Sequence, residues 1–239
     1  MTENFIDPMV FRDGIASTER IDHRVPWEKQ YEVWKHGDGL VSRAESPRDL
    51  EVAVMQLHRA LEQRDTLLNE LYDFQDIPHF GRAKYYAVME ELGLIRSSLK
   101  GQLRSLRNSI VHQFDDVPVD KQQCQYLSDV AWYYLKSTDR IAQQHVTEAE
   151  INYSGQDDAH FTRFTLKFTL RPFAIKVSGD IPAELLLSTP TPDCPIVKPQ
   201  QSHSELYRGV SHFHFTGHLI GSQMCFKQVV KMFFEESAL

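Results

Sequence analysis

The sequence predicts an α+β protein in which an N-terminal antiparallel helical bundle is followed by a smaller antiparallel β part closed by a C-terminal helix. Two observations predict this class. Apolar residues recur at intervals of three and four over most of residues 46–150, which is the spacing of one helix face. After residue 158 the interval shortens to two, the spacing of a half-buried strand, before helical spacing returns near the C-terminus. We therefore expect an N-terminal arm (1–45), the bundle (46–150) and a C-terminal α+β part (158–239).

Composition and charge limit the class of protein. With 239 residues, of which 41% are hydrophobic and 25% charged, the chain can bury one large core or two small ones. No apolar run reaches membrane-spanning length and the N-terminus lacks a signal-peptide layout, so we expect a cytoplasmic protein with no membrane partner. The net charge of -7 argues against a protein that coats nucleic acid without specificity.

The first helices have clear start or stop signals. A short helix is expected from Trp27 to His36, because glycines follow it at positions 37 and 39. Ser46 and Pro47 then suit an N-cap and a first helical position, and helical spacing continues from there to about Tyr72. The segment 77–81 breaks the chain, so the bundle needs further helices after it.

Two more helices complete the expected bundle. Helix returns near Arg82, with a bend at Gly93, and the segment 91–114 then keeps helical spacing. After an acidic turn, Asp120 can cap the next helix, which is expected to reach about Glu148.

The C-terminal part changes period. Apolar and polar residues alternate between Phe161 and Val177, which predicts a strand that is interrupted or turned at Arg171-Pro172. Four prolines between positions 190 and 199 predict a loop too long for a tight hairpin. A second strand is expected over 207–220, followed by a final amphipathic helix built on Phe226, Val229, Val230 and Phe233.

The segment 91–114 has three faces when it is drawn as a helix. One is an apolar stripe made of Ile95, Leu99, Leu103, Leu106 and Ile110. Beside it lies a basic stripe made of Arg96, Lys100, Arg104 and Arg107. On the third face, small and polar residues accompany Asn108 and His112, an i,i+4 pair that lies one above the other. Arg107 points about 100° away and can join this pair only by curling its long side chain.

An arginine, a carboxamide and a histidine are the side chains that a protein needs to bind and cleave a phosphodiester. The spacing leaves a second interpretation open. Arg107 would then be one base of a solvated stripe, and His112 would stabilise a helix C-terminus through the macrodipole.

The surroundings of the motif carry a family resemblance. Leu-Arg-Asn-x-x-x-His ends a long helix at Arg107, Asn108 and His112, and an acidic turn with a proline (115–118) and another helix follow. This arrangement resembles the HEPN superfamily of helical bundles with an R-x4-6-H motif, and the resemblance covers roughly residues 46–146. Family members with a nucleotidyltransferase antitoxin usually carry a tyrosine two residues after the histidine. This chain has Phe114 there, so control through that tyrosine does not carry over.

The resemblance implies a metal-independent endoribonuclease without a cofactor. It also implies three partners, namely RNA, a second copy of the chain whose motif completes the cleft, and an antitoxin or other regulatory protein of a toxin-antitoxin or phage-defence system. In this reading Arg107, Asn108 and His112 are catalytic, and the basic stripe residues Arg96, Lys100 and Arg104 bind substrate. The alternative within the family is a non-catalytic dimer that binds a nucleotide, RNA or a partner protein.

The C-terminal part contains a second group of polar side chains. His212, His214 and His218 share one face of the expected strand, and His203 lies upstream. Histidines two residues apart on a strand can chelate a transition metal, which leaves a metal-dependent enzyme as a third, weaker hypothesis. The favoured interpretation is that they are exposed or sheet-pairing histidines on a polar face. A wider interpretation, which the sequence leaves open, is that this sheet recognises the target, an antitoxin partner or RNA.

Overall fold

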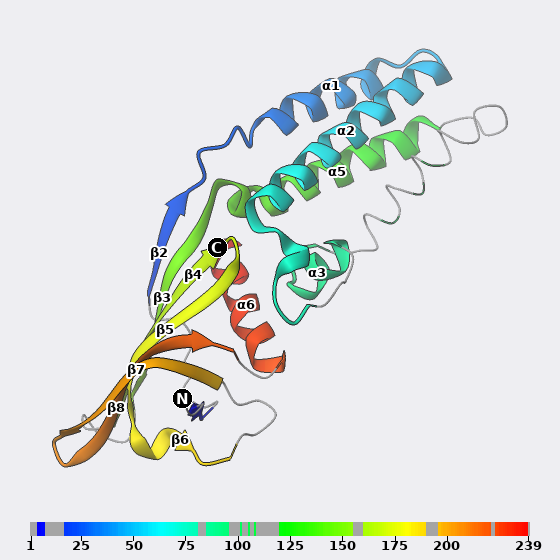
Figure 1. Cartoon of the computed structure of the whole chain (residues 1–239). Coiled ribbons are helices and arrows are strands. Elements are labelled where there is room, and N and C mark those ends of the chain that lie inside the picture. Colours follow the sequence, from blue (N-terminus) through cyan, green and yellow to red (C-terminus); the bar gives the residue numbers. More distant parts are fainter. Residues whose placement is uncertain are drawn as a thin grey trace. The chain divides into compact units, whose positions relative to one another are not determined.

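The computed structural model describes residues 4–7, 17–80, 85–95, 101, 105, 108, 120–154, 160–189, 196–220 and 223–238. The chain divides into two compact units. The helical unit comprises 22–74 and 83–143 with the last two residues, and the sheet unit comprises 1–21, 75–82 and 144–237. Helices dominate the first and strands the second (Figure 1). Among the described helices, none is both long enough and apolar enough to cross a membrane.

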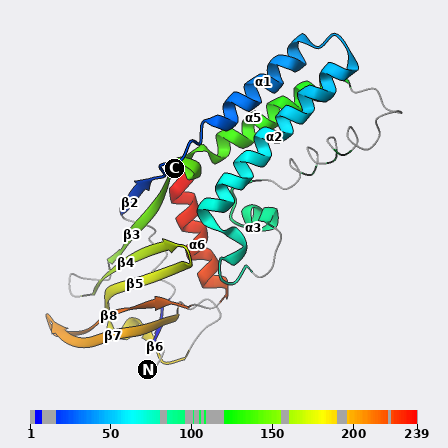
Figure 2. The same cartoon turned by 45° about the horizontal axis from the view of Figure 1, so that its top comes forward.

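The helical unit is built on three packed helices. They are α1 (Lys29–Arg43), α2 (Pro47–Tyr72) and α5 (Lys121–Gln143), which lie side by side in both views (Figure 1, Figure 2). The short helices η2 (Phe74–Asp76) and α3 (Tyr85–Glu91) follow α2 along the chain. Their shared core consists of Val41 from α1, apolar residues of α2 from Leu50 to Leu61, and apolar residues of α5 from Cys124 to Tyr134.

The expected start of α2 is confirmed. Ser46 is the N-cap, and its hydroxyl oxygen accepts a hydrogen bond from the backbone N–H of Asp49 at 3.3 Å. The Asp49 carboxylate in turn accepts from the backbone N–H of Ser46 at 2.9 Å. This reciprocal capping box satisfies two helix N-terminal donors, which stabilises such a helix start by about 1 kcal/mol. The predicted end at Tyr72 is also confirmed.

The predicted end of α1 at His36 is wrong, because the helix continues through Gly37 and Gly39 to Arg43. Gly37 is buried where α1 crosses α2, and a Cβ atom there would stand 3.0 Å from Cδ2 and from Cγ of Leu57. The glycine therefore lets the two helices approach closely. Packing against α2 outweighs the weak helix propensity of glycine. That weak propensity is why the sequence alone predicted a helix end at this position.

The helix expected to bend at Gly93 ends there instead. Gly93 has a φ of 77° and donates its N–H to the carbonyl of Glu90, while Leu94 donates to the carbonyl of Met89, both at 2.9 Å. These two bonds form a Schellman motif, which terminates α3. A single helix starting at Glu91 is therefore excluded. Beyond residue 95, the described residues 101, 105 and 108 are helical.

The sheet unit contains one eight-stranded sheet with the order β2-β3-β4-β5-β8-β7-β1-β6. Its strands are β1 (Asn4–Ile6), β2 (Ser17–Asp22), β3 (Gln144–Ser154), β4 (Phe161–Leu170), β5 (Phe173–Pro182), β6 (Leu186–Leu187), β7 (Ile196–Tyr207) and β8 (Val210–Leu219). The short helix η3 (Ala183–Leu185) precedes β6, and α6 (Gln223–Ala238) ends the chain. The predicted turn at Arg171-Pro172 and the predicted final helix are confirmed.

The predicted fold class needs a correction. The protein is α+β, but the strands form the larger unit rather than a smaller part appended to a bundle. Several strands belong to the sheet although the sequence did not assign them to it. Strands β1 and β2 come from the N-terminal arm, β3 replaces the expected end of a helix near Glu148, and β7 replaces much of the proline-rich loop. These segments become strands because they pair with strands far away in the sequence. The local sequence therefore predicts them poorly.

One face of the sheet forms the second core. Phe168 of β4 and Phe173 of β5 pack against Phe233 of α6, with ring centroids 4.5 and 5.9 Å apart. Gly179 of β5 lies directly opposite Phe164 of β4, and a Cβ atom at Gly179 would stand 2.3 Å from the Phe164 ring. The buried apolar residues thus occupy the face that α6 covers (Figure 2), and the opposite face carries the polar side chains.

Candidate functional site

The predicted catalytic motif lies partly within the described residues. Asn108 is helical and half-buried. Arg107 and His112 lie outside the described residues, as do the predicted substrate-binding residues Arg96, Lys100 and Arg104.

The helix expected after the motif is present as α5. Asp120 precedes it, and its carboxylate accepts a hydrogen bond from the backbone N–H of Gln122 at 3.3 Å. The apolar face predicted for this helix is buried, with Leu127, Val130, Ala131, Tyr134 and Leu135 packed inward. This helix therefore follows the motif residues in the chain, as the sequence predicts.

A network of polar side chains, half-buried except for buried Tyr134, joins α2 to α5 and α3. The Asp65 carboxylate accepts hydrogen bonds from the hydroxyls of Tyr134 and, at 2.6 Å, Tyr86. Burial, followed by the charge of Asp65, raises the pKa of Tyr134 well above its ordinary value. The Tyr134 hydroxyl therefore stays protonated and donates, and with the bond from Tyr86 it stabilises the packing of the three helices.

A second buried group acts in the same way. Arg64 is fully buried, and its guanidinium pairs with Asp139 at 3.1 Å and donates to Thr138 Oγ1 at 3.3 Å and to the Trp27 carbonyl at 3.1 Å. The positive charge is thus compensated within the helical unit. A buried guanidinium with several partners anchors helices together and has no access to substrate.

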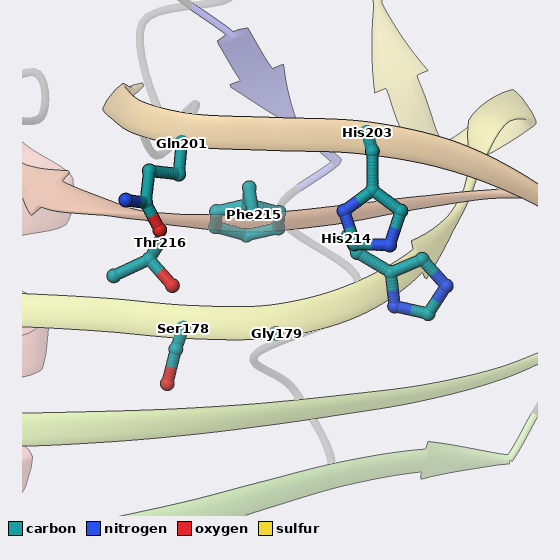
Figure 3. A pocket seen from close by; sticks show the side chains of 7 residues that line it. All are labelled: Ser178, Gly179, Gln201, His203, His214, Phe215 and Thr216. Atoms are coloured by element: carbon teal, nitrogen blue, oxygen red, sulfur yellow. The ribbon is translucent and has the colours of Figure 1, made fainter.

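The polar face of the sheet unit holds the densest group of imidazoles among the described residues. Strand β8 lies between β5 and β7, and residues directly opposite one another share a face. This register aligns Asp180, His214 and His203 in one row, with His212 and Glu205 paired in a neighbouring row. The side chains therefore come from three adjacent strands. Figure 3 shows two of them, His203 of β7 and His214 of β8, next to each other.

His214 stands at the centre of this group. Its ring stacks on that of His203 with a centroid distance of 4.7 Å and an interplanar angle of 14°. Its Nδ1 lies 3.5 Å from Asp180 Oδ2, and its Nε2 lies 3.7 Å from Glu205 Oε2. Both ring nitrogens of His214 thus face a carboxylate.

The three histidines singled out in the sequence have different surroundings. His212 is completely buried, and its Nδ1 lies 2.7 Å from Asp180 Oδ1. His218 lies four residues beyond His214 on the same face of β8, about 13 Å along the strand, opposite Lys176 and Lys198. The structure places His203 and Glu205 beside His214 and leaves His218 apart.

The sequence did not single out Glu205 as a candidate site residue, because most of the segment that forms β7 was expected to be a loop. The spacing His203-x-Glu205 was the available signal, since residues two apart share a face once the segment is a strand. The ligand atoms of His203, Glu205 and His214 all lie within 4.8 Å of one another.

Next to this group lies a shallow, solvent-open hollow with a cavity volume of about 300 Å³. It is lined by Ser178, Gly179, Gln201, His203, His214, Phe215 and Thr216 (Figure 3). Hydroxyl, amide and imidazole groups dominate the lining, so the hollow suits a small polar ligand or a hydrated ion better than an apolar one.

The fold and this hollow define an α+β protein with a helical unit and an imidazole-bearing sheet unit. No protein-family model matches the chain, and comparisons with curated proteins and with solved structures found no match either.

Proposed function

We propose that this chain is a metal-independent endoribonuclease of the HEPN type, which cleaves RNA by transesterification at the 2′-hydroxyl. One observation carries the proposal: the sequence Arg107-Asn108-x-x-x-His112, with a helical Asn108, precedes α5 of a helical bundle. If the helix at Asn108 continues for one more turn, the amide of Asn108 and the imidazole of His112 lie on the same face.

The proposed chemistry assigns one role to each side chain. His112 removes the proton from the 2′-hydroxyl or protonates the 5′-oxygen, because an imidazole with a pKa of about 6.5 does either near neutrality. Arg107 neutralises the charge that grows on the phosphoryl oxygens, and Asn108 holds the imidazole or the phosphate. The 2′-oxygen bonds to phosphorus as the bond to the 5′-oxygen breaks, so the product carries a 2′,3′-cyclic phosphate.

Each chain supplies one such histidine, so separate acid and base groups require a homodimer. The basic side chains of Arg96, Lys100 and Arg104 would then hold RNA phosphates along the cleft, at a local excess of six bases over two acids between residues 82 and 107. We place this activity in the cytoplasm, in a toxin-antitoxin or phage-defence system in which an antitoxin or another regulatory protein keeps it silent.

The sheet unit favours a second candidate function, in which the chain binds a nucleotide, RNA or a partner protein without cleaving it. The observation behind it is the exposed polar face, where Lys176, His218 and Lys198 lie in one row across β5, β8 and β7. Lys167 of β4 extends this row and pairs with Glu148 at 2.7 Å. A row of bases on an open sheet attracts phosphates without any catalytic group.

The test is cleavage of a mixed RNA pool by the full chain in EDTA, with analysis of the product ends. Cyclic-phosphate ends that disappear in Arg107→Ala and His112→Ala, but not in the exposed control His36→Ala, would support the endoribonuclease. Intact RNA with the unaltered protein, together with RNA retention in a filter-binding assay, would instead support the second candidate. Toxicity on expression gives an independent readout, since His112→Ala should relieve growth arrest caused by an active enzyme.

A further inference from the structure

We propose that His203, Glu205 and His214 form a binding site for a divalent transition-metal ion of the zinc class on the β7–β8 hairpin. The site belongs to the sheet unit and is independent of the proposed RNA cleavage, which proceeds in EDTA. It differs from the histidine trio suggested by the sequence, since His214 is the only residue common to both sets.

The backbone register brings the three ligands together. His203 and His214 are direct cross-strand partners, and Glu205 lies two residues beyond His203 on the same face of β7. Donor atoms of all three lie within 4.8 Å of one another. Tetrahedral zinc with bonds of 2.0–2.1 Å needs neighbouring donors about 3.3 Å apart, so the widest separation must close by about 1.5 Å at most. His203 is exposed and the Glu205 side chain is 69% exposed, so both can rotate without disturbing packed neighbours.

Asp180 gives a second, independent observation that points to a metal. Its Oδ2 lies 3.5 Å from Nδ1 of His214, while its Oδ1 is fixed at 2.7 Å from buried His212. A carboxylate beside one ring nitrogen favours the tautomer that leaves the other nitrogen as a ligand, as is usual for metal-bound histidines. The free nitrogen is Nε2, the atom that faces Glu205 at 3.7 Å.

The donor set selects the class of ion. Two imidazole nitrogens and one carboxylate oxygen suit zinc and its neighbours, whereas calcium and magnesium prefer six or more oxygens or retain several waters. Three protein ligands leave a coordination position for water or another ligand. His203 and His214 also line the hollow, which places Gln201 and Thr216 near that position.

The proposed ion would bind β7 and β8 together in a region where β7 makes few other contacts. Residues 201–207 of β7 are exposed on both faces, so hydrogen bonds to β8 supply most of their order. An ion shared by the two strands would fix the hairpin and hold the polar face in one geometry.

The test is metal binding by the full chain after treatment with a chelator. Zn²⁺ is titrated against a chromogenic chelator, and Co²⁺ is followed by its visible d–d absorption, which distinguishes four- or five-coordinate from octahedral cobalt. We expect one equivalent of Zn²⁺ at micromolar concentration or below and a four- or five-coordinate Co²⁺ spectrum. His203→Gln and His214→Gln should each abolish the spectrum, and Asp180→Asn should weaken affinity by about 10–100-fold.

The matched control is His218→Gln, which removes an imidazole from the same face of the same strand and should leave affinity and spectrum unchanged. Glu205→Gln keeps the size of the side chain and should weaken binding while circular dichroism stays that of the unaltered protein. Failure of the unaltered protein to bind either ion would overturn the proposal. So would binding that survives both His203→Gln and His214→Gln, because the ion would then lie elsewhere.

Discussion

Replacing Gly179 by alanine should destabilise the sheet unit, because the added methyl group has no space. A Cβ atom at this position would lie 2.3 Å from Cδ1 of Phe164 and 2.8 Å from the carbonyl oxygen of Arg163. The ring is fully buried and the carbonyl belongs to the paired strand β4, so neither can move aside freely. Overpacking costs about 1–3 kcal/mol, and removal of a strand glycine returns about 0.5–1 kcal/mol, so the middle of these ranges gives a net loss of about 1 kcal/mol.

Urea unfolding followed by far-ultraviolet circular dichroism measures this loss. At a slope of about 2 kcal/mol/M, the midpoint should fall by about 0.5 M. Tryptophan fluorescence is a useful second signal, since Trp27, Trp34 and Trp132 all belong to the helical unit and none to the sheet unit. The matched control is Ser178→Ala, which alters the neighbouring half-exposed side chain on the polar face.

A double-mutant cycle with Phe164→Leu separates the ring from the backbone. The smaller side chain should relieve part of the cost of Gly179→Ala, so the two changes should be non-additive. An alanine variant as stable as the unaltered protein, or additive effects in the cycle, would refute the reasoning from close contact.

Three further changes test the helical unit. Ser46→Ala removes the capping box and should lower the free energy of unfolding by about 1 kcal/mol, measured by urea unfolding with tryptophan fluorescence; an unchanged midpoint would contradict the assigned role of the cap. Burial lowers the pKa of His23, whose ring contacts Tyr72, so protonation favours the unfolded chain. Stability should therefore be complete above pH of about 6.5 and decline as the pH falls through the folded-state pKa, and His23→Gln should reduce this slope; equal slopes would count against it. Asp65→Asn weakens the acceptor that Tyr134 needs in a buried position and should cost about 1–3 kcal/mol by the same assay, whereas a neutral effect would mean that the hydroxyl finds another partner.

Local signals explain which elements could be predicted from the sequence. Ser46 and Pro47 predict the start of α2, and Arg171 and Pro172 predict the turn between β4 and β5. The final helix follows from its own apolar spacing. Each of these features depends on residues within a few positions of one another.

Elements fixed by distant partners could not be predicted in this way. Gly37 favours a helix end by propensity, yet it lies inside α1 because Leu57 packs against it. Pro199 suggested a loop, yet it lies within β7 at a register irregularity, where the missing N–H is tolerated. The candidate site also depends on residues far apart in the sequence. Alternation placed His214 on a polar face, but only the pairing of β7 with β8 reveals His203 and Glu205 as its neighbours.

The sheet order has a consequence for synthesis of the protein on the ribosome. Strands β1 and β2 are made first, yet β2 pairs at one end of the sheet with β3, and β1 pairs near the other end with β6 and β7, whose residues follow more than a hundred positions later. The residues of the helical unit leave the ribosome before those strands do. Strands β1 and β2 therefore stay unpaired until β3, β6 and β7 have been synthesised, by which time the helices can fold. The sheet is expected to form last, because its contacts join residues far apart in the sequence.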